Sequence, residues 1–260
     1  MELKDYKEND TRKSDFKELK ITSNNIKLVP FYYENELYNI LEFEISSEIA
    51  QFAYNLACWK SPHIKDKINY PKRTEDEKLY HIILGCISEI MCYLYIKYLG
   101  IDDEDPRYYD IERESPEYNS LEEFDIKIKD RTMSVKVIPS IYNKEEKLFT
   151  YSDIVIKGTG KSSDRYYSQF LLSNGKQMNY ISDLPVIKEC IEKKEKLPIS
   201  LYYLGGIVNK YDLVWEELLE NNETVRCHHK KVIKFNKSTS LDNYIKLIFN
   251  DLNKNYGGLL

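Results

Sequence analysis

A long, largely apolar segment from about Thr74 to Tyr98, within "TEDEKLYHIILGCISEIMCYLYIKYL", constrains the fold more than any other feature of the sequence. Acidic residues open the segment and Gly100 follows it, which matches the dipole and C-cap preferences of a helix. The pattern therefore predicts one long helix over this range. Because most of the remaining side chains in it are apolar, we expect this helix to be largely buried.

Short strands dominate the sequence after this helix. Alternating and apolar runs predict strands at about 123–129, 132–138, 151–157, 166–172, 198–208 and 226–235, and helices at 183–196, 212–222 and 238–255. A helix, a series of strands, and then a helix and a strand together indicate one α/β domain of mixed type. We expect residues 71–260 to form its core and residues 1–70 to form a mainly helical N-terminal elaboration, with helical spacing from about Ser46 to Trp59.

The distribution of charge along the chain says more about the function than the net charge does. The chain has 260 residues, 42% of them hydrophobic, which is enough for one sizeable core. Its net charge of −5 argues against a uniformly cationic nucleic-acid binder. Acids nevertheless gather in residues 101–125 and bases in residues 226–237. An acidic metal site with separate basic surfaces has this pattern, and so do solvated loops of alternating sign.

Several classes of protein are disfavoured. The five cysteines include no C-x-x-C pair, so we expect neither a disulfide framework nor a structural zinc site. No uninterrupted apolar run reaches the roughly 18–20 residues that span a bilayer. The first twenty residues are charged throughout and lack the apolar region of a secretory signal. We therefore expect a soluble, cytoplasmic protein that makes no contact with a membrane.

Glu89 is an acid within the predicted buried helix. An ionised carboxylate in such a place needs a lysine, an arginine or a metal ion as its partner. The alternative is that Glu89 lies on a polar stripe that faces solvent. The helix pattern alone leaves both interpretations open.

The segment "FDIKIKDRTMSVKV", residues 124–137, predicts a hairpin with a polar face. Alternation along the two strands places Asp125, Ser134 and Lys136 on that face. A carboxylate here could bind a metal ion, and a lysine could orient water or stabilise charge on a phosphate. A surface hairpin with scattered lysines would have the same pattern.

The order of these features resembles the PD-(D/E)xK nuclease superfamily, which includes many restriction endonucleases. The resemblance covers roughly residues 74–250 and implies a restriction-endonuclease-like mixed sheet flanked by helices. In that family an acid lies on the first helix, an aspartate on the second strand, and an acid-x-lysine motif on the third. These positions correspond here to Glu89, Asp125 and, for the lysine, Lys136.

The sequence departs from the family pattern at two places. Phe124 stands where a proline usually precedes the aspartate, and Ser134 occupies the position of the second acid. Serine binds Mg²⁺ more weakly than a carboxylate does. We expect Glu89 to supply the missing charge, although Glu122 or Glu123 could also do so, and Ser134 to hold a water molecule.

The resemblance implies a Mg²⁺-dependent nuclease, with Mn²⁺ as a possible substitute, and most directly a restriction-type endonuclease that cuts double-stranded DNA. Asp125 and Glu89 would bind the metal, Lys136 would position the attacking water, and a homodimer would cut both strands. Residues 1–70 would supply dimer or DNA contacts. Two alternatives remain open: an inactive nucleic-acid-binding or sensing protein on the same fold, and an RNase or toxin.

The glycine-rich stretch "KGTGKSS", residues 157–163, is a candidate backbone contact for nucleic acid. It lacks the first glycine of a phosphate-binding P-loop, because Val155 stands at that position. Small residues let phosphates approach, and the cations of this region and of the basic stretch are candidate contacts. A simple hairpin turn would explain the glycines equally well. The candidate contacts are Lys157, Lys161, Arg165, Lys230 and Lys231.

Overall fold

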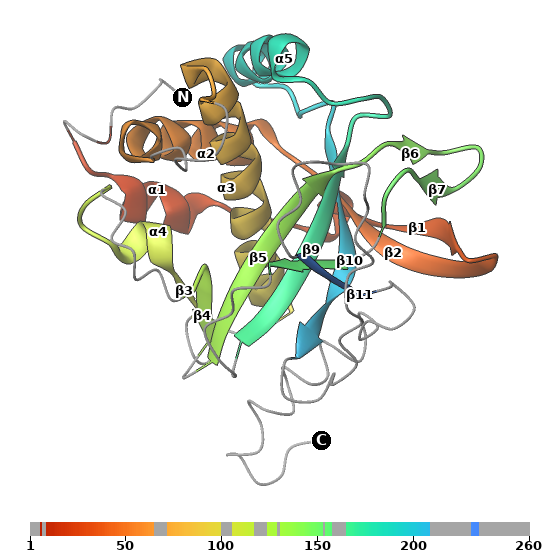
Figure 1. Cartoon of the computed structure of the whole chain (residues 1–260). Helices are drawn as coiled ribbons and strands as arrows, with labels where there is room; N and C mark the ends of the chain where they lie inside the picture. Colours follow the sequence, from red (N-terminus) through yellow and green to blue (C-terminus); the bar gives the residue numbers. More distant parts are fainter. Residues whose placement is uncertain are drawn as a thin grey trace, which may run out of the picture.

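The structure is a computed structural model. It describes Tyr6 and residues 9–64, 72–99, 106–116, 124–128, 131–152, 154–157, 165–208 and 230–233. Within these residues the chain combines helices with one large, mostly antiparallel sheet, and so is of mixed α and β structure as expected (Figure 1).

The large sheet has seven strands in the order β1-β2-β10-β9-β5-β4-β3. Its neighbouring strands pair antiparallel, with the exception of β5 and β9, which run parallel. The strands are β1 (Ile26–Tyr33), β2 (Glu36–Glu44), β3 (Arg107–Tyr108), β4 (Ile126–Ile128), β5 (Arg131–Pro139), β9 (Arg165–Ser173) and β10 (Ser200–Val208).

Helices and two small sheets complete the described fold. The helices are α1 (Arg12–Glu18), α2 (Ser47–Lys60), α3 (Glu75–Tyr98), α4 (Tyr109–Glu112) and α5 (Tyr180–Lys193), with 3-10 turns at Ser23–Asn25 and Ser61–His63. One small sheet pairs β6 (Tyr142–Asn143) with β7 (Leu148–Phe149). The other pairs β8 (Ile154–Lys157) with β11 (Lys230–Ile233).

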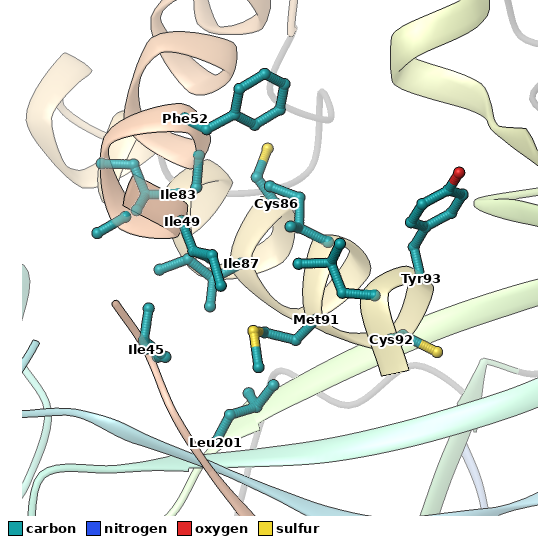
Figure 2. Close-up of a cluster of buried hydrophobic side chains, with 14 of the residues drawn as sticks. Ile45, Ile49, Phe52, Ile83, Cys86, Ile87, Met91, Cys92, Tyr93 and Leu201 are labelled. Atoms are coloured by element: carbon teal, nitrogen blue, oxygen red, sulfur yellow. The ribbon is translucent and has the colours of Figure 1, made fainter. Parts of the chain in front are cut away.

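The larger hydrophobic core lies between the helices and one face of the large sheet, which we call the helix face. Figure 2 shows Ile49 and Phe52 of α2 with Ile83 and Ile87 of α3, and Leu201 of β10 at the sheet. These side chains are almost fully buried. Each apolar side chain that folding removes from water contributes about 1.5–3 kcal/mol, so this core is the main source of stability.

A smaller core lies on the opposite face of the sheet. Leu171, Tyr202 and Leu204 alternate with the residues of the helix face along β9 and β10, and they pack with Tyr142 and Phe149 of the β6–β7 hairpin. The two cores therefore show to which face of the sheet each strand residue points, including the candidate site residues of β5.

Helix α3 confirms the long helix expected from the sequence. The Thr74 side chain caps it by accepting the backbone N–H of Glu77 at 3.1 Å, and three acids occupy its first turn. By length and composition α3 would suffice to cross a membrane, but 72% of its most apolar window is buried inside the fold. That environment is typical of a core helix, and the absence of a membrane contact stays a prediction.

The N-terminal region is not mainly helical, so this part of the prediction is wrong. Residues 26–44 form the β1–β2 hairpin, whose strand β2 pairs with β10 in the large sheet. The hairpin turns at Glu34 and Asn35, both of which have positive φ. Helix α2 confirms the helix expected from about Ser46 to Trp59. Residues 9–64 thus share one core with the rest of the described chain.

The outer edge of β1 is partly blocked. The Tyr32 N–H donates outward to the carbonyl oxygen of Lys147 at 2.8 Å, next to the β6–β7 hairpin. Pro30 has the same orientation in the strand but has no N–H, and its carbonyl oxygen accepts the Tyr142 hydroxyl at 2.5 Å. These features limit pairing of this edge with another chain.

The expected strands after α3 correspond to β4, β5, β8, β9, β10 and β11, and the expected helix at 183–196 corresponds to α5, which begins three residues earlier. The helices expected at 212–222 and 238–255 lie outside the described residues. The restriction-endonuclease-like arrangement as such stays a prediction.

Candidate functional site

Asp125 is held by β5 on one side and by the first residue of α4 on the other. Its backbone N–H donates to the carbonyl oxygen of Met133 at 3.0 Å, and its own carbonyl oxygen accepts the Tyr109 N–H at 3.1 Å. Its side chain turns toward β5, where Oδ2 accepts the Val135 N–H at 2.6 Å.

Lys136 lies beside this carboxylate. Its Nζ is 3.5 Å from Asp125 Oδ2 and also donates to the carbonyl oxygen of Val135 at 3.2 Å. The side chain is 41% exposed, so its ammonium group is accessible from solvent. The structure therefore brings together Asp125 and Lys136, as the hairpin pattern predicts.

Ser134 and Lys136 leave β5 on the face opposite to the helices. Met133 and Val135 belong to the core of the helix face, and side chains alternate along a strand. Ser134 is only 8% exposed there. The shared face of Ser134 and Lys136 agrees with the prediction, but Glu89 belongs to a helix on the other face.

Glu89 on α3 is partly buried, and its Oε2 accepts the hydroxyl of Tyr108 at 2.8 Å. Burial raises the pKa of its carboxyl to about 8, Lys60 counteracts this rise, and the negative charges of Asp125 and Asp110 add to it. Glu89 is thus within electrostatic reach of Asp125. Its hydrogen-bond partner is a tyrosine hydroxyl, not the lysine or arginine that the sequence suggested.

A buried ion cluster lies next to Tyr108. Asp110 is 3% exposed, forms a close ion pair with Lys60, and has Oδ1 3.0 Å from a guanidinium nitrogen of Arg113. The hydroxyl of Tyr108 is 3.4 Å from the other oxygen of Asp110. Within this cluster the charge of Lys60 favours the ionised form of Glu89, whereas the charge of Asp110 opposes it.

Arg12 attaches the N-terminal helix to this cluster. Its guanidinium donates to the carbonyl oxygens of Asp110 and Arg113, each at 2.9 Å, and lies 3.5 Å from the centre of the Trp59 ring. The same group forms an ion pair with Asp10 at 2.7 Å. Arg12 is 1% exposed, so its contacts with the two carbonyl oxygens and with Trp59 are made inside the fold, whereas Asp10 lies at the surface.

The site has some of the ligands that a hard divalent cation requires. Glu89 and Asp125 supply carboxylate oxygens, which Mg²⁺ prefers. Because burial and two neighbouring acids disfavour ionisation of Glu89, a cation near both carboxylates would offset that cost. Within the described part of the chain, no group of three or more histidine, cysteine, aspartate or glutamate side chains could hold a metal ion. A bound ion would therefore keep several waters or take phosphate oxygens as ligands.

The structure describes some, but not all, of the candidate nucleic-acid contacts. Lys157 of β8 and Lys230 of β11 are cross-strand partners, although they lie far apart in the sequence. Lys231 follows on the same strand, and Arg165 begins β9 opposite Thr132 of β5. Lys161 lies outside the described residues.

Sequence reasoning missed Tyr108, Asp110 and Lys60. The acidic stretch around Tyr108 has no alternation and reads as a loop, and Lys60 reads as the cationic end of a helix. The hydrogen bond of Tyr108 to Glu89 and the ion pair of Lys60 with Asp110 join elements that are distant in sequence. A single sequence carries no signal for such pairings.

The chain matches no protein-family model, and comparisons with curated proteins and with solved structures give no match either.

Proposed function

We propose that this protein is a Mg²⁺-dependent nuclease that hydrolyses phosphodiester bonds, with double-stranded DNA as its first candidate substrate. The observation that carries the proposal is the close approach of Lys136 to Asp125, with Glu89 within electrostatic reach of the same aspartate. A carboxylate pair and an accessible lysine are the groups that metal-assisted phosphate chemistry requires.

The order of elements adds support. Helix α3 carries Glu89, and strands β3, β4 and β5 follow it in sequence and are neighbours in the sheet. Asp125 immediately precedes the second of these strands, and Lys136 lies on the third. This is the arrangement implied by the resemblance to PD-(D/E)xK nucleases.

Each residue has a role that follows from its surroundings. Glu89 and Asp125 would hold Mg²⁺, which when bound acts as a Lewis acid toward a phosphate oxygen. The half-exposed ammonium of Lys136 can move from Asp125 to a non-bridging phosphate oxygen and stabilise the charge that develops there. The backbone bonds of Asp125 hold its carboxylate in place without any contribution from substrate.

A cleavage assay tests the proposal. The purified chain is incubated with linear and supercoiled DNA in Mg²⁺, Mn²⁺ or EDTA, and with RNA in parallel. Wild type should cut, EDTA should abolish cutting, and Lys136→Ala should lower the rate by about 10²-fold or more. Lys127→Ala is the matched control, because Lys127 lies on the same hairpin with its ammonium over the Phe124 ring. Equal activity of the two lysine variants would contradict the assigned role of Lys136.

One observation favours a second candidate, a non-catalytic nucleic-acid-binding or sensing protein. Ser134 occupies the position where the family has an acid, and it is almost buried on the face away from Glu89. In that case DNA would stay intact under every metal condition, while binding would persist in both Lys136→Ala and wild type. Cutting of RNA but not of DNA would favour the remaining alternative, an RNase or toxin.

A further inference from the structure

The short segment Arg107–Glu112 contacts both acidic residues of the candidate site, Glu89 at its carboxylate and Asp125 at its backbone. The side chain of Tyr108 donates to Glu89 on α3, and the backbone N–H of the next residue, Tyr109, donates to the carbonyl oxygen of Asp125. Two adjacent residues thus bond the side chain of one acid and the backbone of the other.

We infer that Tyr108 is a positioning residue for Glu89 and determines which of its oxygens can approach a divalent cation. The Tyr108 hydroxyl takes one lone pair of Oε2, so Oε1 is the less occupied oxygen and the one that we assign to the ligand. This inference rests on the proposed function, because it concerns the binding of the cation that function requires.

The direction of the Tyr108 proton follows from its two neighbours. The hydroxyl is 2.8 Å from Glu89 and 3.4 Å from Asp110. Asp110 is already paired with Lys60 and Arg113, so it has less need of a third donor. The Tyr108 hydroxyl therefore donates to Glu89.

The ion cluster keeps the tyrosine itself in place. Asp110 lies two residues after Tyr108 and is bound to Lys60 at the end of α2, while Arg113 closes the other side of the carboxylate. The Tyr108 ring also packs on Phe16 of α1, with ring centres 5.5 Å apart. Tyr108 is therefore a fixed donor, which is what orienting a metal-binding carboxylate requires.

The test is Mn²⁺ binding by the purified full-length chain, measured by electron paramagnetic resonance without any substrate. Tyr108→Phe removes only the hydroxyl and should weaken Mn²⁺ binding about 10- to 100-fold. In cleavage, the Mg²⁺ concentration for half-maximal rate should rise, while the rate at saturating Mg²⁺ changes less. The control is Tyr142→Phe, which also removes one buried tyrosine hydrogen bond, but on the opposite face of the sheet.

The outcomes separate the inference from the proposed function. Wild type that neither binds Mn²⁺ nor cuts nucleic acid would overturn both. If wild type binds Mn²⁺ and cuts nucleic acid, and Tyr108→Phe binds Mn²⁺ as tightly as Tyr142→Phe does, the inference alone is overturned. If Tyr108→Phe does not fold, Mn²⁺-soaked crystals of wild type decide: an anomalous peak at Oε1 supports the inference, and a peak at Oε2 with Tyr108 displaced overturns it.

Discussion

Asp125 Oδ2 has two partners, the backbone N–H of Val135 and the ammonium of Lys136. One oxygen thus serves both the fold and the candidate chemistry. These two roles can be separated by substitution, because an amide oxygen accepts a hydrogen bond but carries no charge.

Asp125→Asn should fold like wild type and be inactive, since its amide oxygen can still accept the Val135 N–H. Asp125→Ala leaves that N–H without its partner and should cost about 1–3 kcal/mol of unfolding free energy. Chemical denaturation and the cleavage assay, run on both variants, check this. Equal stability of the two variants would show that the Val135 bond contributes nothing.

Glu89 makes the stability depend on pH. Its folded-state pKa of about 8 lies above the ordinary value of 4.5. The folded chain therefore keeps a proton that the unfolded chain has lost, and stability falls as pH rises from about 4.5 to about 8. Glu89→Gln removes this dependence and should be more stable than wild type at pH 8 by about 1 kcal/mol or more.

Thermal unfolding of Glu89→Gln and wild type at pH 5 and pH 8.5 measures the effect. The variant should gain over wild type at pH 8.5 and differ little at pH 5. A gain of the same size at both pH values would rule out titration of Glu89 as its cause.

Asp125 and Lys136 could be predicted from sequence because a short hairpin fixes their neighbours through local alternation. The surroundings of Glu89 could not. Its partner Tyr108 is 19 residues away, across a chain segment without periodicity, and Lys60 of the ion cluster comes from another helix.

At the scale of elements, the edge of β1 shows how pairing of the large sheet with another chain is limited. Pro30 has no N–H to offer on the outer side, and the β6–β7 hairpin meets its carbonyl oxygen through Tyr142. Pro30→Val would restore an outward donor and favour pairing between copies.

We expect Pro30→Val to self-associate at concentrations where wild type does not, as measured by light scattering after gel filtration. Asn39→Val is the matched control. Asn39 is the cross-strand partner of Pro30, so the same side chain is added to the same face without a new backbone donor. Association of both variants would point to side-chain hydrophobicity as the cause.

Elements with strong local signals were predictable, as α3 with its cap and acidic first turn illustrates. The β1–β2 hairpin was missed because its turn, Glu34-Asn35, lacks glycine. In addition, β2 pairs on its other side with β10, which lies far along the chain. Helix α5 begins before Pro185, since Asn179 caps it and Asp183 accepts the backbone N–H of Asn179 at 2.7 Å. These two bonds fix the start of the helix ahead of the proline.

At the scale of the molecule, Arg12 connects the N-terminal helix to residues that follow it by about a hundred positions. Arg12→Ala would leave two carbonyl oxygens without their donor and remove the group that lies over Trp59. We expect a loss of about 3–5 kcal/mol in a single unfolding transition. Calorimetry measures this.

The control for Arg12→Ala is Lys13→Ala, at an exposed position of the same helix. It should change the free energy of unfolding by no more than about 0.5 kcal/mol. Two separate transitions in Arg12→Ala would show that residues 1–70 unfold independently. The homodimer and the DNA contacts of those residues stay predictions.

The pairing of β2 with β10 has a consequence for synthesis of the chain. Glu42 and Tyr202, whose side chains bond across these strands, are 160 residues apart. At about 5–20 residues per second, a ribosome adds the second roughly 8–32 s after the first. During that interval β2 has no β10 to pair with, so the nascent chain offers a bare strand edge to chaperones and to neighbouring chains.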